Sequence, residues 1–275
     1  MSKPKKSQLP GFGLTLGLSL SYMSLLIFIP LIALILYAAK LPAADFWEII
    51  VDERVKSAFK ISFLSTFYAA AVNFFLGLII AWVLARYQFF GKRIIDALID
   101  LPFAIPTAVA GISLSTIFSS QGIMGKILGV FGIDISFSRA GIVVALIFIG
   151  LPFVVRTVQP VIEELDAELE EAAASLGANF YQIFVKVIFP SLLPSLLTGF
   201  ALAFARGLGE YGAIIFISSN MPYQTEIVPL LIVKKLAQFN YAGASAIGVT
   251  MLVCAFVLLL LINFLQVYAK RRSKN

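Results

Sequence analysis

Residues 171–184, EAAASLGANFYQIF, form a polar, helix-forming stretch in a chain that is otherwise mostly apolar. At its start, six acidic residues fall within the nine positions 163–171. Apolar runs long enough to cross a bilayer lie on both sides. A polar, helix-forming segment between two spans lies outside the membrane, and it is longer than a simple connection requires. This stretch is therefore the first candidate for a functional site.

The composition places the rest of the chain in a membrane. Of its 275 residues, 60% are hydrophobic and only 13% are charged, whereas a soluble domain carries about 25% charged residues. Runs of about 20 apolar residues, the length that crosses a hydrocarbon core of about 30 Å, recur along the sequence. We therefore expect an all-α integral membrane protein, with residues 1–275 in a single transmembrane domain.

Six transmembrane helices are predicted from these runs, and an even number of spans places both termini on one side. Leaving out Arg206, which falls deep within a span, lysine and arginine number 12 on that side and 8 on the other. By the positive-inside rule, both termini are expected in the cytoplasm. The predicted spans are residues 14–39, 57–86, 94–118, 140–160, 190–217 and 243–269.

The residue types that are scarce or missing exclude several functions. The chain has no histidine, which removes Ser-His-Asp and Cys-His catalysis and the histidine-containing zinc sites. Its single cysteine, Cys254, lies in an apolar run, where an inert buried thiol is expected. No basic helix with interleaved aromatic residues indicates a nucleic-acid groove. We expect no catalytic residue, no metal site and no nucleic-acid partner.

Two polar loops are predicted to contain short helices. Segment 226–239 is too short and too charged to span, and it predicts an amphipathic helix at the outer membrane interface. In the loop at about 161–189, apolar residues recur at helical spacing, Gly177 can end a first helix, and Pro190 marks the start of the next span. Its apolar stripe with small alanines suits docking into a groove on another protein, and a solvated surface helix fits the same pattern.

The pattern Glu171-Ala-Ala-x3-Gly177-x9-Val187-x-Phe189-Pro190 resembles the EAA loop of the membrane subunits of ABC importers. The family pattern ends in Ile-x-Leu-Pro, so Val187 and Phe189 depart from it while keeping its apolar character. The resemblance implies a type I ABC importer permease fold, in which this loop is the coupling helix that fits a cleft in a cytoplasmic ATPase. It assigns coupling to Glu171, Ala172, Ala173, Leu176, Gly177 and Pro190.

ATP hydrolysis is expected to belong to a separate subunit. The chain has no G-x-x-x-x-G-K-[ST] loop, because Gly125-Lys126 and Gly91-Lys92 lack the following Ser or Thr. This subunit is therefore expected to bind no cofactor, while ATP and magnesium are used by the ATPase dimer. The expected mechanism is alternating access, in which ATPase closure moves the spans as rigid bodies.

The resemblance extends to the sulfate and molybdate branch of these permeases. Within that branch, two segments are more similar to the T-type subunits of sulfate/thiosulfate importers: FNYAGASAI at 239–247 and LPGFG at 9–13. The similarity covers about residues 9–268. The stretches that carry the branch are LPFAIPTAVAG at 101–111, GLPFVVRTVQP at 150–160 and GFALAFARGLGEYG at 199–212.

The T-type resemblance implies a set of partners. They are a second, W-type permease, a cytoplasmic ATPase dimer and an external sulfate-binding protein, all at a bacterial-type inner membrane with its lipid. A molybdate or tungstate permease, which more often pairs with itself, is the alternative within the family. A stand-alone carrier driven by ion gradients is the alternative from another class, but it leaves the acidic loop unexplained.

Three residues are candidates for the translocation path. Arg206 and Glu210 lie four residues apart in the predicted fifth span, within reach of an ion pair. An ionisable residue deep in a span faces a cavity or a partner, so the pair either locks the packing or places Arg206 where it attracts a dianion. Thr107 adds a hydroxyl beside Pro102 and Pro106, where the backbone either lines a cavity or is simply kinked.

Overall fold

The computed structural model describes residues 11–272, with side-chain surroundings described up to Phe264. Lys3, Lys5, Lys6 and Lys274, on which the predicted orientation partly depends, lie outside these residues. Within the described part of the chain, every regular element is a helix. The prediction of an all-α protein is confirmed.

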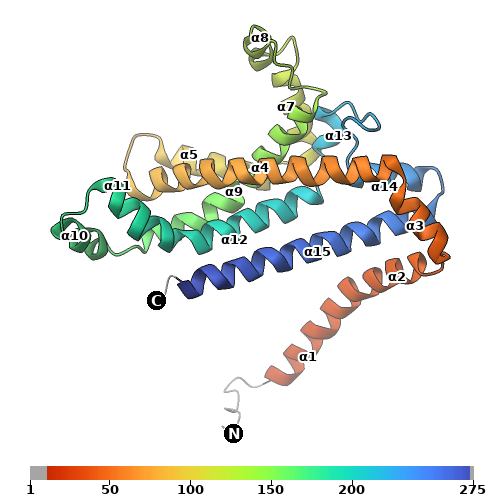
Figure 1. Cartoon of the computed structure of the whole chain (residues 1–275), viewed down its shortest axis with the longest axis horizontal. Coiled ribbons are helices and arrows are strands. Elements are labelled where there is room, and N and C mark those ends of the chain that lie inside the picture. The colour runs from red at the N-terminus through yellow and green to blue at the C-terminus, as the bar shows by residue number, and fades with distance from the viewer. Residues whose placement is uncertain (1–10, 273–275) are drawn as a thin grey trace.

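The helices that form the bundle lie side by side in Figure 1. Helix α9 (Arg139–Glu163) packs against both α4 (Glu53–Arg86) and α12 (Phe189–Leu208), and α15 (Tyr241–Arg272) packs against α12. Their shared core contains Leu84, Val154, Val155, Val158, Leu192 and Leu196, all almost inaccessible to solvent. Among the described residues, five segments are long and apolar enough to cross a membrane: Phe12–Ala38, Glu53–Arg86, Arg139–Glu163, Phe180–Leu208 and Tyr241–Phe264.

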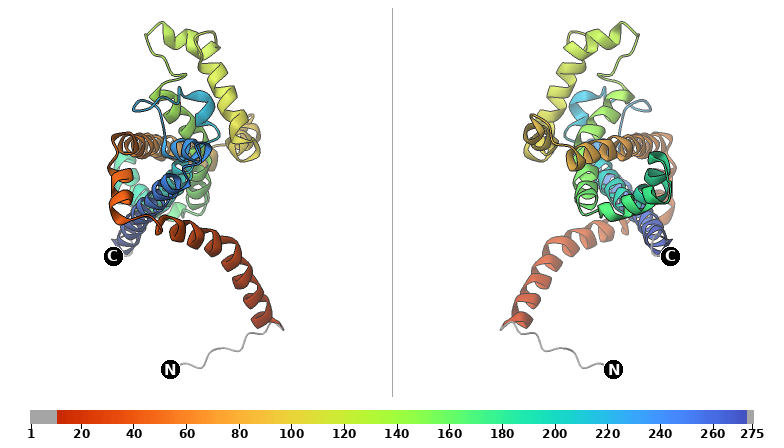
Figure 2. Two further views of the ribbon diagram at one scale, coloured as in Figure 1. Left: turned by 90° about the vertical axis from the view of Figure 1, so that its right-hand side faces the viewer. Right: turned by 90° about the vertical axis from the view of Figure 1, so that its left-hand side faces the viewer.

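The first of these segments packs against α15 through its second half, α2 (Ile29–Ala38), while its first half leaves the bundle. It consists of α1 (Phe12–Met23), one wide π turn η1 (Ser24–Phe28) and α2 (Ile29–Ala38). Figure 2 shows it bending away from the other helices. None of the residues in its apolar window is buried within the chain. Such a surface is stable against lipid or another subunit, but not against water.

The third predicted span, residues 94–118, is not one continuous helix. It is divided into α5 (Lys92–Ile99), α6 (Leu101–Ala104) and α7 (Thr107–Phe118), with a break at Ile105 and Pro106. Pro106 lacks an N–H and its ring disfavours the helical conformation at the preceding residue, which explains the break. Helix α7 projects from the bundle and carries α8 (Ile123–Gly129) at its tip (Figure 1).

The fifth span begins earlier and ends earlier than predicted. Helix α11 (Phe180–Ile183), the π turn η2 (Phe184–Ile188) and α12 run on as one helical segment. Pro190 therefore lies inside a continuous helix instead of starting it, and the wide turn before it makes room for its ring. At the other end α12 stops at Leu208, and the chain turns before the short α13 (Ile214–Ile217).

The segment predicted as an amphipathic helix at the outer interface packs one face against the bundle. Helix α14 (Val228–Ala237) buries Val228 and Leu231 against α4 and α15. Near it, α3 (Ala43–Val51) joins the first span to α4. The opposite face of α14 stays exposed at Val233 and Leu236, so the helix is amphipathic as predicted, while its place at the outer membrane interface stays a prediction.

Candidate functional site

Helix α10 (Ala167–Ser175) lies at one end of the bundle, opposite the end that carries α3 and α14 (Figure 1). Its C-terminus is closed by two backbone hydrogen bonds, from the N–H of Gly177 to the Ala174 carbonyl at 2.9 Å and from Ala178 to Ala173 at 3.1 Å. Gly177 has a φ of 84°, the left-handed conformation that this type of helix end requires. The predicted glycine turn is confirmed.

The second short helix follows the turn at once. Asn179 caps α11 by accepting a hydrogen bond from the Gln182 N–H at 2.9 Å, while the Gln182 side chain accepts one from the Asn179 N–H at 3.0 Å. This reciprocal pair fixes the direction in which α11 enters the membrane span. The loop is thus a helix closed by a glycine turn, followed by a second helix with a capped N-terminus.

The outward face of this loop is apolar. Leu176 is 90% exposed, and Phe180 and Tyr181 are exposed to 75% and 73%. Beside them, a shallow groove of about 400 Å³ runs between Ala173 and Val187. Large apolar side chains that stand out at a helix turn are typical of surfaces that another protein covers.

An ion pair ties α10 to the second span. Arg86, the last residue of α4, pairs through its guanidinium with the Glu170 carboxylate. The same guanidinium lies over the Trp82 ring, 5.2 Å from its centroid. The sequence pattern assigned coupling to residues of the loop alone and did not identify this tether. In the sequence, the only signal for this ion pair was that Arg86 ends a predicted span on the same side of the membrane as the acidic loop at 161–189.

The coupling residues predicted from the EAA pattern occupy different surroundings. Glu171, Ala172 and Leu176 are exposed on α10 or at its end, and Ala173 is half-buried beside the groove. Gly177 forms the turn, whereas Pro190 lies farther along, beyond η2. The structure thus gathers all of them except Pro190 around α10. Their role in coupling stays a prediction.

The predicted pair of Arg206 and Glu210 is formed, with 2.8 Å between guanidinium nitrogen and carboxylate oxygen. Arg206 belongs to the last turn of α12, while Glu210 lies just after the helix, not within the span as predicted. The Glu210 side chain is 2% exposed and accepts a second hydrogen bond, from the Ala213 N–H at 2.9 Å. Glu210 therefore pairs with Arg206 and also stabilises the turn between α12 and α13.

Thr107, the third path candidate, lies against the same turn. Gly212 approaches Thr107 so closely that a Cβ at residue 212 would overlap the threonine hydroxyl. One turn further along α7, a Cβ at Gly111 would lie 2.7 Å from the Ala213 Cα. The start of α7, just after the break in the third span, is therefore in direct contact with the turn between α12 and α13. Thr107 lies on one side of this contact, and the turn that Glu210 stabilises lies on the other.

Two further ion clusters were not foreseen. Arg156 of α9 donates 2.8 and 2.7 Å hydrogen bonds to the two carboxylate oxygens of Asp100, and its Nη1 lies 2.7 Å from Asp96. These bonds hold α5 against α9. At the opposite end, Glu226 is 1% exposed and binds Arg54 and Lys234, each with a shortest distance of 2.6 Å.

The Glu226 cluster has a defined electrostatic balance. Burial raises the pKa of Glu226, but the hydrogen bonds from Arg54 and Lys234 outweigh burial, and its pKa lies below the ordinary value. The carboxylate therefore stays ionised and holds α4 to the start of α14. Across residues 11–272, no group of three or more histidine, cysteine or carboxylate side chains could hold a metal ion.

Comparison with known proteins identifies the family. Residues 73–275 match the family described as the binding-protein-dependent transport system inner membrane component. The chain belongs to this family. This permease is 48% identical over 264 residues to the sulfate transport system permease protein CysT of Escherichia coli (strain K12), with 96% of this chain and 95% of the relative covered. It is 46% identical over 254 residues to the Synechocystis protein of that name, with 92% and 89% covered.

Solved structures support the fold. A bacterial ABC transporter involved in the import of the acidic polysaccharide alginate matches with a TM-score of 0.77 at 18% identity, covering 93% of this permease and 95% of that chain. The inward-facing MetNI methionine ABC transporter matches with a TM-score of 0.55 at 19% identity, covering 85% and 99%. These likenesses concern fold alone, and they confirm the predicted type I ABC importer permease fold.

Proposed function

We propose that this permease is the membrane subunit that translocates sulfate or thiosulfate in an ATP-driven importer. The observation that carries the proposal is its 48% identity, along nearly the whole chain, to a protein named as a sulfate transport system permease. The same identity favours sulfate over molybdate or tungstate. A polar loop with an exposed apolar face, placed at one end of the bundle, supports an importer that works with a second protein over a stand-alone carrier.

The partner at α10 is a cytoplasmic ATPase dimer, which binds ATP and magnesium. The exposed Leu176, Phe180 and Tyr181 supply the apolar face that a cleft in the ATPase covers. Small residues on α10, among them Ala172 and Ala173, permit close approach. This assignment places α10 and both chain termini in the cytoplasm, and places α3 and α14 on the outer side of a bacterial-type inner membrane.

Besides the chain that leads into it from α9, two connections join α10 to the membrane helices. The ion pair between Arg86 and Glu170 links it to α4. The glycine turn at Gly177, followed by the capped α11, links it to the continuous helix of the fifth span. ATPase closure therefore moves the second and fifth spans together. Arg206 and Glu210 lie at the far end of that fifth span, where such a movement alters access.

The remaining partners complete the importer. A W-type permease pairs with this chain in the membrane, and an external sulfate-binding protein delivers the anion to the outer side. Membrane lipid or the second permease covers the apolar surface of α1 and α2, whose apolar window is not buried within this chain.

The test is to tag this permease, purify it in mild detergent from its native host, and identify the proteins that accompany it. An ATPase and a distinct six-span permease are expected, together with binding-protein-dependent uptake of [35S]sulfate after reconstitution. An ATPase with this permease alone would indicate a homodimeric importer of the molybdate type. Uptake by this chain without any ATPase would overturn the proposal.

A further inference from the structure

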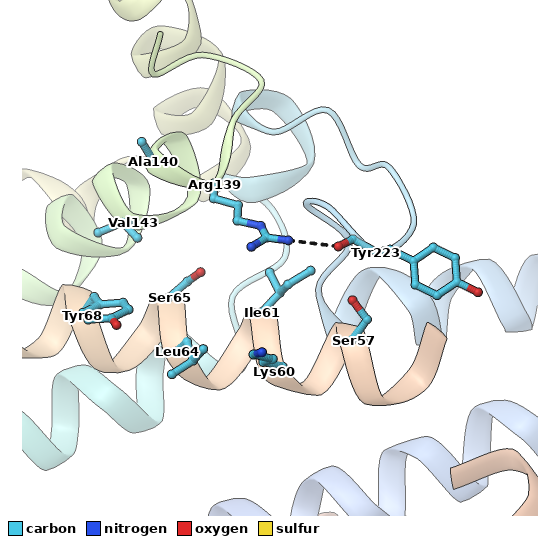
Figure 3. A pocket seen from close by; sticks show the side chains of 10 residues that line it. All are labelled: Ser57, Lys60, Ile61, Leu64, Ser65, Tyr68, Arg139, Ala140, Val143 and Tyr223. Carbon is cyan, nitrogen blue, oxygen red and sulfur yellow. Dashed lines mark hydrogen bonds between the residues drawn. The ribbon is translucent and has the colours of Figure 1, made fainter. Parts of the chain in front are cut away.

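A pocket of about 420 Å³ opens at the end of the bundle opposite α10. It lies between the first turns of α4, the first turns of α9 and the loop before α14, as Figure 3 shows. Its volume exceeds by several-fold the roughly 30 Å³ share of one liquid water molecule, so it has room for a small hydrated ion. Its polar lining consists of Ser57, Lys60, Ser65, Tyr68, Arg139 and Tyr223.

The arginine in this pocket is held in place without being neutralised. Arg139, the first residue of α9, donates hydrogen bonds to the backbone carbonyl oxygens of Gln224 at 2.6 Å and Tyr223 at 3.0 Å. Figure 3 shows its side chain extending from α9 toward α4. Carbonyl groups carry no net charge, so the positive charge of the guanidinium remains available to a ligand.

Lys60 adds a second positive charge from α4. Within residues 11–272, neither Lys60 nor Arg139 forms an ion pair with a carboxylate. The neighbouring cations differ, because Arg54 and Lys234 are both bound to Glu226. This pocket therefore contains two cations that are not paired with any carboxylate of the described residues, whereas the nearby Arg54 and Lys234 share the carboxylate of Glu226.

The other polar groups in the pocket are hydroxyls. Ser57 and Ser65 come from the same helix as Lys60, and Tyr68 and Tyr223 border the space. Hydroxyls donate hydrogen bonds to anionic oxygens, and charge-assisted bonds to an oxyanion are stronger than neutral ones. Among the described residues, no carboxylate lines the pocket, so nothing in its lining favours a cation.

We propose that this pocket is an outer reception site for a tetrahedral oxyanion on its way to the translocation path. The inference rests on the proposed function, which places this end outside and makes the substrate a dianion. Lys60 and the Arg139 fork attract the dianion, and the hydroxyls of Ser57, Ser65 and Tyr68 replace part of its hydration shell. Two cations in a pocket with low-dielectric walls raise the local anion concentration, which favours capture after release from the binding protein.

The first measurement compares uptake by reconstituted importers that carry Lys60→Gln or the matched control Lys56→Gln. Lys56 lies one turn earlier on α4, is exposed, and does not line the pocket. Lys60→Gln is expected to lower the rate of [35S]sulfate uptake roughly tenfold at limiting loaded binding protein, the size of one charge-assisted hydrogen bond. Lys56→Gln is expected to leave the rate unchanged.

The second measurement detects the anion directly in the whole complex. Ser57→Cys, in a Cys254→Ser background, is labelled in dodecyl maltoside with an anionic methanethiosulfonate. Sulfate is expected to slow labelling, and Lys60→Gln is expected to abolish both this protection and the fast reaction with the anionic reagent. Lys56→Gln again serves as the control.

The outcomes separate this inference from the proposed function. If the wild-type complex imports sulfate while Lys60→Gln changes neither uptake nor labelling, the reception site is wrong and the sulfate importer stands. If sulfate protects the Ser57→Cys complex from labelling but is not imported, the oxyanion pocket stands and the substrate proposal fails. Protection by added phosphatidylglycerol but not by sulfate would make the occupant a lipid headgroup and overturn the reception site.

Discussion

Arg86 at the end of the second span is paired with Glu170 in the helix of the coupling loop, and both side chains are mostly shielded from water. The pair joins residues that are 84 positions apart in the sequence. It joins α10 to the membrane helices in addition to the chain itself, which leads into α10 from α9 and out of it into α11. A pair in this position stabilises the loop only modestly, but it links α10 directly to α4.

We expect Arg86→Gln to uncouple the importer more than it destabilises it. Loss of a partly exposed ion pair costs about 1 kcal/mol or less, so the ATPase is expected to co-purify in normal amounts. Sulfate uptake per ATP hydrolysed is expected to fall several-fold, as measured in proteoliposomes. Glu168→Gln, an exposed neighbour on α10, is the matched control. Equal coupling ratios in the two variants would contradict the tether.

A second prediction concerns the left-handed turn at Gly177. No atom lies within 4 Å of a Cβ built there, so Gly177→Ala meets a conformational cost, about 1–2 kcal/mol, and no clash. We expect this variant to displace α10 and lower ATP-driven uptake, while Gly177→Asn retains more activity because Asn tolerates this conformation. Gly129→Ala, which has equal space and no positive φ, is the control and is expected to be neutral.

The pH dependence of stability provides a third prediction. The pKa of Glu226 is below its ordinary value of 4.5 because Arg54 and Lys234 bind its ionised form. The unfolded chain therefore takes up this proton at a higher pH than the folded chain, and the stabilisation present above about pH 4.5 is lost as pH falls through the lower folded pKa. The melting temperature of the purified permease is expected to fall over that range.

Glu226→Gln provides the matching variant for this titration. At pH 7 it is expected to destabilise the permease by about 2 kcal/mol, less than the 3–5 kcal/mol of a fully buried pair, because both cations can still reach water. Its melting temperature is expected to depend less steeply on pH below 4.5. Differential scanning fluorimetry measures both effects, and identical pH profiles for the variant and the wild type would contradict the assignment.

The contact between the third and fifth spans yields a fourth prediction. A Cβ at Gly212 would overlap the Thr107 hydroxyl, so Gly212→Ala is expected to push α7 away from the turn and reduce the amount of assembled complex. Thr107→Ala in the same chain removes that hydroxyl and is expected to restore part of the assembly. The measurement is the yield of complex by size-exclusion chromatography. Absence of any rescue would show that the two residues do not meet.

The sequence predicted well whatever depends on local pattern. Apolar runs of span length identified the bundle, and Gly177 identified the end of α10, because each signal is contained in neighbouring residues. The spacing of Arg206 and Glu210 also identified their ion pair, since four residues correspond to about one helical turn. These features need no knowledge of tertiary contacts.

Features that depend on distant partners were missed or misplaced. The ion cluster of Glu226 was not foreseen, because its partner Arg54 is 172 residues away in the chain. Arg156 was counted only among the basic residues of the inner side, although it binds Asp96 and Asp100. The early end of the fifth span at Leu208 was hidden, because the following residues are apolar enough to continue a span. In each case tertiary contacts decided the structure.

The last prediction separates the two interpretations of Arg206. If Arg206 faces the path, Arg206→Ala lowers sulfate uptake about tenfold or more, while the complex assembles normally because Glu210 keeps its bond to the Ala213 N–H at 2.9 Å. If the pair only locks the packing, the loss appears in the yield of complex, and the assembled fraction transports at the wild-type rate. Arg206→Lys keeps the charge, so it is expected to retain more uptake than Arg206→Ala. Unchanged uptake by Arg206→Ala would remove this residue from the path.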